Sequence, residues 1–111
     1  MKDLLRDEIP PGTLYLLILK TLSLGENHGY GIAQHIWSTS GEILQVEEGS
    51  LYPALQRMLL KGWVECEWKQ TENNRRARYY RLTRAGRKQL AEERTQFQRV
   101  TGAIGQVLAA G

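Results

Sequence analysis

The spacing of apolar residues along the chain predicts three short helices, a β-hairpin and one long final helix. Residues 14–22 are apolar on nearly all sides, which is typical of a helix at the centre of a core, and Thr13 or Gly12 is the expected cap at its start. A second helix is predicted over residues 30–38, after a turn at residues 26–29. The helices dominate this pattern, so the expected domain is mainly helical.

The stretch of residues 48–64 predicts the most clearly marked helix, and the rest of the chain is arranged around it. Ser50 can cap the first backbone N–H groups, and Pro53 is tolerated only near the first turn of a helix. Gly62 supplies the left-handed residue that ends the helix. The buried face is expected to hold four residues at i, i+4, i+7 and i+8, namely Leu51, Leu55, Met58 and Leu59.

The opposite face of this central helix is polar and carries no carboxylate. It presents the hydrogen-bond donors Ser50, Tyr52, Gln56 and Arg57. Glutamine and arginine are the residue types that make paired hydrogen bonds to adenine and guanine in the major groove. Such a face suits a surface rich in hydrogen-bond acceptors; the alternative is an ordinary solvated helix face.

The period of the pattern changes to 2 after the central helix, which predicts a hairpin. A half-buried strand is expected over residues 64–69, turn chemistry follows at residues 71–74, and a returning strand is expected over residues 78–83. On this pattern Cys66 is an inert buried thiol and Trp68 packs at the root of the hairpin. The tip carries the guanidinium groups of Arg75, Arg76 and Arg78.

A final helix is predicted from Thr83 or Arg84 almost to the C-terminus. Glu93 interrupts its apolar seam, and Gly102 and Gly105 weaken the helix. The seam is longer than a small core needs, which favours a homodimer over packing within one chain. It has coiled-coil-like spacing and consists of Leu90, Phe97, Val100, Ile104 and Val107.

These elements divide the 111 residues into an N-terminal arm, a central unit and a C-terminal helix. Three helices, a two-stranded hairpin and a long helix follow the order of a winged helix-turn-helix with a C-terminal dimerisation helix. The expected fold class is therefore mainly α with α+β character. The expected boundaries are 1–11 for the arm, 12–83 for the DNA-binding unit and 84–111 for the dimerisation helix.

Charge is distributed unevenly along the chain, although the net charge is only +3. Between Asn73 and Leu90 there are seven lysines or arginines and no aspartate or glutamate. A cationic patch on a small domain suits nucleic acid, an acidic membrane surface or an acidic protein. The longest apolar run, residues 14–19, is too short to span a bilayer, and no signal peptide is evident. We therefore expect a cytoplasmic protein without a membrane partner.

The chain offers little for catalysis or metal binding. One cysteine and two histidines cannot supply a four-ligand zinc site. The sequence also shows no catalytic arrangement of a nucleophile with a general base, and no catalytic pair of carboxylates. We expect no metal, no cofactor and no enzymatic activity. His28 and His35 are expected to be ordinary surface residues.

Three segments of the chain resemble the PadR family of bacterial transcriptional regulators. They are Gly29-Tyr30-Gly31-Ile32, a block from Gly49 to Met58 that contains LYPAL, and a block from Arg78 to Arg87 that contains YYRLT. With Gly12-Thr13-Leu14 the similarity covers about residues 12–90. The resemblance implies a homodimeric DNA-binding repressor with a winged-helix unit and one C-terminal dimerisation helix, as in the small members of the family.

The expected DNA contacts come from the central helix and the hairpin tip. Arginines of the hairpin would neutralise phosphates, while Gln56 and Arg57 would contact bases. Tyr52 has two interpretations, a DNA contact or packing against the hairpin. The full set of expected DNA-contacting residues is Ser50, Tyr52, Pro53, Gln56, Arg57, Arg75, Arg76 and Arg78.

Two functions are open from the sequence. The first is a dimeric repressor that binds an inverted repeat in double-stranded DNA. The second is a winged-helix module whose basic face binds an acidic protein. No separate effector domain is visible, so a small-molecule effector would have to bind at the dimer interface; otherwise regulation follows from the amount of protein alone.

Overall fold

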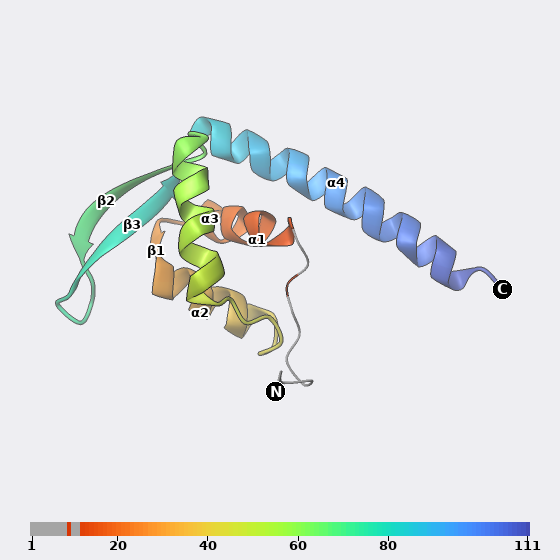
Figure 1. Ribbon diagram of the computed structural model, residues 1–111, viewed down its shortest axis with the longest axis horizontal. Helices are drawn as coiled ribbons and strands as arrows, with labels where there is room; N and C mark the ends of the chain where they lie inside the picture. Colours follow the sequence, from red (N-terminus) through yellow and green to blue (C-terminus); the bar gives the residue numbers. More distant parts are fainter. Residues whose placement is uncertain (1–8, 10–11) are drawn as a thin grey trace.

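The computed structural model describes residue 9 and residues 12–111. The expected N-terminal arm, residues 1–11, therefore lies outside the described residues except for Ile9. The elements follow the predicted order with one addition, a short strand before the second helix (Figure 1). Their bounds are α1 Thr13–Ser23, β1 Asn27–His28, α2 Gly29–Thr39, α3 Glu48–Leu60, β2 Val64–Gln70, β3 Arg76–Leu82 and α4 Arg84–Ala109.

The core lies where the first three helices meet the root of the β2–β3 hairpin. Ile18 and Leu19 in the middle of α1 are completely buried, as the apolar pattern of that helix predicts. Leu59 is only half-buried and packs at the edge of the cluster. The other core residues come from α1, α2, α3, β2 and β3: Leu22, Ile32, Ile36, Leu51, Ala54, Leu55, Met58, Val64, Tyr80 and Leu82.

The sheet has three antiparallel strands in the order β1–β3–β2. The prediction of a plain turn at residues 26–29 is wrong, because Asn27 and His28 pair with Tyr80 and Tyr79 of β3. Two residues are too few for a period of 2 to be visible, so the sequence pattern could not indicate this strand. The pairing fixes the start of α2 against the hairpin.

Helix α2 begins directly after β1, and its first turn is tightly packed. The Nδ1 atom of His28 accepts a hydrogen bond from the backbone N–H of Gly31 at 3.1 Å. His28 is therefore the N-cap of α2, and its prediction as an ordinary surface residue is wrong. A Cβ at position 31 would lie 2.0 Å from Asn27 Oδ1, so a larger residue there would displace the Asn27 side chain.

Helix α3 begins earlier than its sequence signals indicate. Its N-cap is Glu47, so the prediction that Ser50 caps the helix is wrong, and Pro53 lies inside the helix rather than in its first turn. Pro53 cannot donate the backbone hydrogen bond that the carbonyl of Gly49 would otherwise accept. The end of the helix is as predicted, because Gly62 has a φ of 76°.

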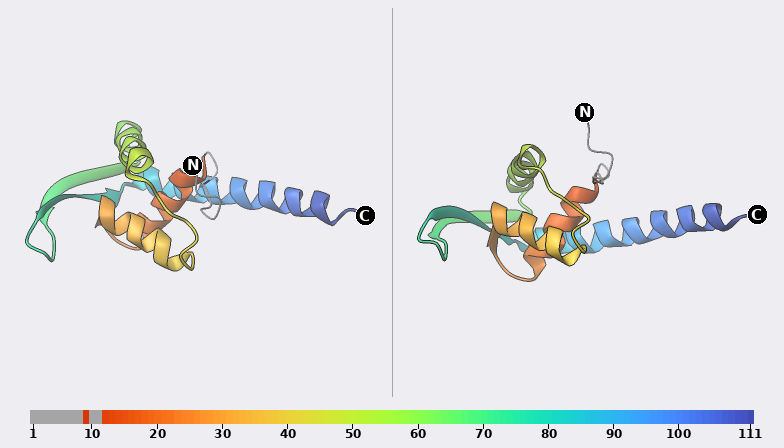
Figure 2. Two further views of the ribbon diagram at one scale, coloured as in Figure 1. Left: turned by 60° about the horizontal axis from the view of Figure 1, so that its bottom comes forward. Right: turned by 90° about the horizontal axis from the view of Figure 1, so that it is seen from below.

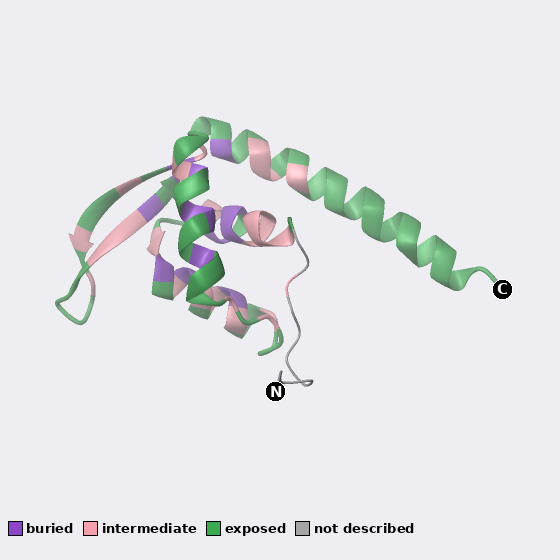
Figure 3. Ribbon diagram, in the orientation of Figure 1, coloured by how far each residue is buried: buried purple, intermediate pink, exposed green. Residues whose placement is uncertain are grey.

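Helix α4 is one continuous helix that runs away from the core, and its free end lies on the opposite side of the molecule from the hairpin (Figures 1 and 2). The hydroxyl of Thr83 caps it by accepting a hydrogen bond from the Gly86 N–H at 3.0 Å. Neither Gly102 nor Gly105 interrupts the helix. Every residue from 94 to 111 is exposed (Figure 3), so most of the helix surface is uncovered in the single chain.

The first turn of α4 packs directly on the turn that joins α3 to β2. The Thr83 hydroxyl donates to the carbonyl oxygen of Gly62 at 2.6 Å, and the Thr83 N–H donates to that of Trp63 at 3.0 Å. A Cβ at Gly86 would lie 2.0 Å from the same Trp63 oxygen. Only glycine at position 86 allows this approach, which fixes the direction in which α4 leaves the domain.

We expect Gly86→Ala to lower the free energy of unfolding by at least about 2 kcal/mol, because the added methyl group would overlap with the backbone of Trp63. The matched control is Gly102→Ala in the same helix, where an added Cβ meets no atom within 4 Å. The control should be more stable than the parent by about 0.5–1 kcal/mol through helix propensity. Urea unfolding followed by circular dichroism measures both, and equal midpoints would contradict the proposed role of Gly86.

Candidate nucleic-acid interface

The hairpin, hereafter called the wing, consists of β2, β3 and the connecting residues 71–75. The strand register places one set of alternate residues on the face that covers the core, here called the inner face: Val64, Cys66, Trp68, Gln70, Arg76, Arg78, Tyr80 and Leu82. The remaining residues form the outer face: Glu65, Glu67, Lys69, Ala77, Tyr79 and Arg81. The two faces differ in charge.

Opposite charges neutralise one another on the outer face. Arg81 Nη1 donates to Glu67 Oε1 at 3.0 Å, and Arg81 Nε lies 3.8 Å from Glu65 Oε1. Lys69 is hydrogen-bonded to Glu26 and lies 3.6 Å from Glu67. The hydrogen bond to Glu26 raises the pKa of Lys69. The cations of the outer face are therefore already paired with carboxylates.

The arginines of the inner face have neutral partners instead. Arg78 Nη2 donates to Cys66 Sγ at 2.8 Å, a bond that raises the pKa of Arg78, and the guanidinium lies 5.8 Å from the centre of the Tyr80 ring. The guanidinium of Arg76 lies over the Trp68 ring at 5.2 Å. These contacts orient both groups without cancelling their charge, because within the described residues neither forms an ion pair with a carboxylate.

Two predictions about the inner face are wrong. Trp68 does not pack at the wing root but is 58% exposed, and Cys66 is only half-buried and accepts a hydrogen bond from Arg78. The cause is that the wing extends past the edge of the core (Figure 1). Inner-face residues beyond that edge have no core residues to pack against. A period of 2 indicates which residues share a face but not where the core ends.

The exposed side of α3 has a central stripe, which consists of Gly49, Pro53, Gln56 and Leu60. These residues follow the spacing i, i+4, i+7 and i+11, and all four are exposed. Ser50 is also exposed and lies beside the stripe near the start of the helix. Leu60 is 79% exposed and is the member that the sequence analysis missed, because an apolar residue at a helix end carried no binding signal.

Tyr52 and Arg57 lie on the two flanks of the stripe, where other helices hold them. Tyr52 packs against the start of α2, so closely that a Cβ at Gly29 would lie 2.8 Å from Tyr52 Cε1. Within the chain, Tyr52 therefore packs against α2. Arg57 Nη1 donates to the Tyr15 hydroxyl in α1 at 3.3 Å, and the Tyr15 ring packs edge-on against Trp63.

Arg75 lies in the exposed turn at the tip of the wing. The turn is closed at its base, because the Thr71 N–H donates to the Arg75 carbonyl at 2.6 Å and the Arg75 N–H donates to Thr71 Oγ1 at 3.3 Å. The expected DNA-contacting residues thus occupy one helix and the wing next to it (Figure 2).

The predicted dimerisation seam is uncovered for most of its length. Leu90 packs half-buried against the core, whereas Phe97, Val100, Ile104 and Val107 are 45, 44, 53 and 73% exposed. A large apolar stripe of this kind is uncommon on the surface of a monomer. Its role as a dimer contact is therefore proposed below.

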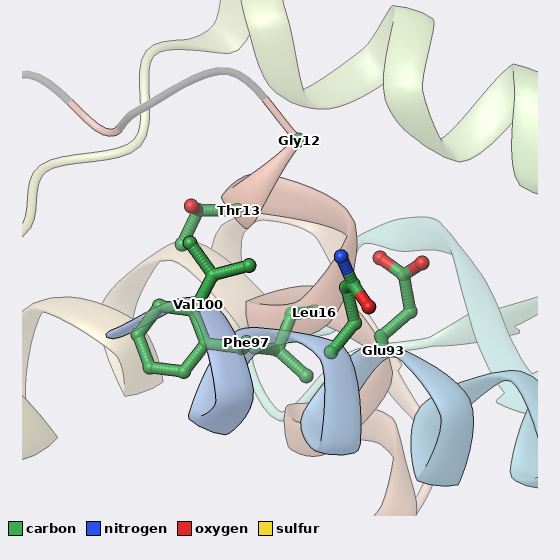
Figure 4. Close-up of a pocket in the computed structure, with 7 residues that line it drawn as sticks. Gly12, Thr13, Leu16, Glu93, Phe97 and Val100 are labelled. Carbon is green, nitrogen blue, oxygen red and sulfur yellow. The ribbon is translucent and has the colours of Figure 1, made fainter. Parts of the chain in front are cut away.

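A pocket of about 230 Å³ lies where the seam passes the start of α1 (Figure 4). The side chains of Phe97 and Val100 from α4 and of Leu16 from α1 form its apolar part, and Val100 extends toward Thr13 at the start of α1. Its other lining residues are Gly12, Thr13, Glu93 and Gln96. This pocket could not be predicted from the sequence, because its residues come from two helices that are far apart in the chain.

Comparison with known proteins identifies the family. The sequence model of the transcriptional regulator PadR-like family matches residues 18–92, from the middle of α1 into α4. The chain belongs to the PadR-like family. The predicted winged-helix fold is thereby confirmed, and the family is one of transcriptional regulators rather than enzymes.

Solved structures of PadR-like proteins have the same fold. A PadR-like transcriptional regulator from Bacillus cereus is 28% identical, with a TM-score of 0.76 over 90% of this chain and 95% of that chain. A PadR family transcription regulator from Clostridium difficile is 26% identical, with a TM-score of 0.75 over 88% of this chain and all of that chain. An uncharacterized protein from Lysinibacillus sphaericus is 29% identical over 80% of this chain and 82% of its own length.

In the described part of this PadR-like chain, none of the helices is both long and apolar enough to cross a membrane. Its histidine, cysteine, aspartate and glutamate side chains form no group of three or more that could hold a metal ion.

Burial raises the pKa of Tyr80, whose phenol lies on the inner face of β3. The fold favours the neutral phenol, so the unfolded chain loses this proton first as the pH rises. The contribution of the neutral Tyr80 phenol to the stability of the fold is complete below about pH 10. It is lost as the pH rises through the higher pKa of the folded state. We expect phenolate absorbance to show a late titration step that Tyr80→Phe removes. Persistence of that step in the variant would contradict the assignment.

Proposed function

We propose that the protein is a homodimeric transcriptional repressor that binds an inverted repeat in double-stranded DNA. The observation that carries this proposal is the difference in charge between the two faces of the wing. Arg76 and Arg78, like Arg57 on α3, are oriented by neutral partners, so their charge is available to phosphate oxygens. Membership of the PadR-like family supports regulation of transcription.

The winged-helix unit, residues 12–83, supplies the DNA contacts in this proposal. Helix α3 lies in the major groove with Gln56 toward the base edges, and Ser50, Tyr52 and Pro53 approach the DNA near the start of the helix. The wing arginines Arg75, Arg76 and Arg78 contact phosphates. Because Tyr15 holds Arg57 on the flank that faces α1, we assign Arg57 to a phosphate rather than to guanine.

The dimerisation helix, residues 84–111, supplies the contact with a second copy. A single chain leaves the apolar side chains of the seam in water, whereas a partner helix would cover them. The interface would be two-fold symmetric, as is usual for homodimers. Two-fold symmetry requires an inverted repeat. Two α3 helices that enter successive major grooves on one face of the DNA would lie about 34–36 Å apart, one turn of DNA.

Repression follows when such a dimer occupies a promoter, and the protein would act in the cytoplasm. A small-molecule effector would bind at the dimer interface, beside the pocket lined by Phe97 and Val100. It would shift the spacing of the two α3 helices only if it bound one spacing more tightly than the other. No cofactor is needed for this function.

We expect Arg76→Ala to weaken binding to every duplex and to reduce the salt dependence of the affinity by about one charge, because a phosphate contact is lost. The matched control is Arg81→Ala on the same strand, whose charge Glu65 and Glu67 already neutralise. The control should change the salt dependence much less. Fluorescence anisotropy with a labelled duplex at several salt concentrations measures both.

Equal effects of the two arginine substitutions would contradict the assignment of DNA to the inner face. The absence of any duplex binding by the parent protein would contradict the proposed function. It would favour the alternative in which the basic face binds an acidic protein.

We expect Ile104→Glu to convert the dimer into a monomer, because a carboxylate in the seam would be desolvated without a partner. The matched control, Thr95→Glu, places the same charge on the exposed face of α4 away from the seam and should remain dimeric. Sedimentation equilibrium measures the mass of each variant. A monomeric parent, or a dimeric Ile104→Glu, would contradict the proposed interface.

A further inference from the structure

The central stripe of α3 has an unusual composition for a surface that meets nucleic acid. Of its four residues, Gly49, Pro53, Gln56 and Leu60, only Gln56 carries a hydrogen-bonding side chain. The same helix buries four other apolar residues, Leu51, Ala54, Leu55 and Met58, on the opposite face. The stripe is therefore one amide between two apolar surfaces.

Leu60 contributes little to the fold that would explain its apolar side chain. It is 79% exposed, whereas its neighbour Leu59 packs half-buried against the core. Lysine and glutamine, which are almost as favourable in helices as leucine, would serve the helix equally well at an exposed position. An exposed leucine in line with Gln56 is therefore a candidate for contact with a ligand.

Two cations next to the stripe, Arg57 and Lys61, contact aromatic side chains. Arg57 is hydrogen-bonded to Tyr15 of α1, and the Lys61 ammonium lies over the Trp63 ring at 5.3 Å. Paired contact with guanine is most commonly made by arginine or lysine, and contact with cytosine by a carboxylate. The stripe presents neither, so its chemistry is poorly suited to G·C base pairs.

The chemistry of the stripe matches A·T base pairs. A glutamine amide makes two hydrogen bonds to adenine N6 and N7, and apolar side chains contact the thymine methyl group, which no other DNA base carries. We propose that α3 selects A·T pairs at the centre of each half-site, with Gln56 on adenine and with Leu60 and Pro53 on thymine methyl groups. This inference rests on the proposed function and specifies which bases the same surface recognises.

The test begins with selection of duplexes from a randomised library by the full-length protein, which yields an operator. Each thymine of that operator is then replaced by deoxyuridine, which removes only the methyl group. We expect about a fourfold loss of affinity at the thymines that Leu60 and Pro53 contact, the effect of exposing one methyl-sized apolar group. Replacing the contacted adenine by 7-deazaadenine, which lacks the N7 acceptor, should weaken binding about tenfold.

The protein variants assign each loss to a side chain. Leu60→Ala should make binding insensitive to deoxyuridine at one thymine, Pro53→Ala at another, and Gln56→Ala should remove the effect of 7-deazaadenine. The matched control is Leu24→Ala, which truncates a leucine that is 62% exposed at the end of α1 and should leave every base effect unchanged. Because Leu60 is exposed, Leu60→Ala should also leave the unfolding midpoint unchanged.

Each outcome separates this inference from the proposed function. An operator whose half-sites have only G·C pairs opposite α3 would overturn the inference while supporting a DNA-binding dimer. Deoxyuridine penalties that persist in both Leu60→Ala and Pro53→Ala would also overturn it. If the protein retains no duplex from the library, the proposed function itself fails.

Discussion

The close contact between the first turn of α4 and the turn after α3 determines how the helices and the wing are arranged. Thr83 bonds to the carbonyls of Gly62 and Trp63, and Gly86 has no room for a side chain beside the Trp63 oxygen. Helix α3, both long strands and α4 therefore meet within a few residues. Because the contact between Gly86 and Trp63 involves backbone atoms, it has little freedom to adjust. The helix proposed to meet DNA and the helix proposed to meet a second copy are thus held in a fixed relation.

The strand register of the wing produces two surfaces that differ in charge. A strand sends alternate side chains to opposite faces, and here every glutamate of β2 falls on the outer face with Arg81 and Lys69. Arg76 and Arg78 fall on the inner face, where an indole, a phenol and a thiol hold them. Such partners restrict the rotamers of an arginine without neutralising it. Binding of an anion to these arginines therefore costs less side-chain entropy.

The sequence predicted the elements of this fold well because helices with long apolar faces and a hairpin with clear alternation leave strong periodic signals. It failed where the signal was short or where tertiary geometry decides. The two-residue strand at Asn27 has no period, and the start of α3 at Glu48 overrides the capping preference of Ser50. For the candidate site, the charge of the residues and their position on one helix face indicated which residues could contact DNA. Neither the contact of Arg57 with Tyr15 nor the exposure of Trp68 and Leu60 could be foreseen, because each depends on where neighbouring elements end.

The unbroken course of α4 would determine how two copies are oriented in the proposed dimer. Gly86, which fixes the helix to the domain, and Phe97, which begins the exposed part of the seam, are separated by about three helical turns and face nearly the same direction. The angle between the two contacts is therefore set by a count of residues. Removing one residue between them would rotate the domain by about 100° around the helix axis. In the proposed dimer, the helical phase of α4 would therefore set the spacing of the two α3 helices, and an insertion or deletion in α4 that changes this phase would alter the proposed half-site spacing.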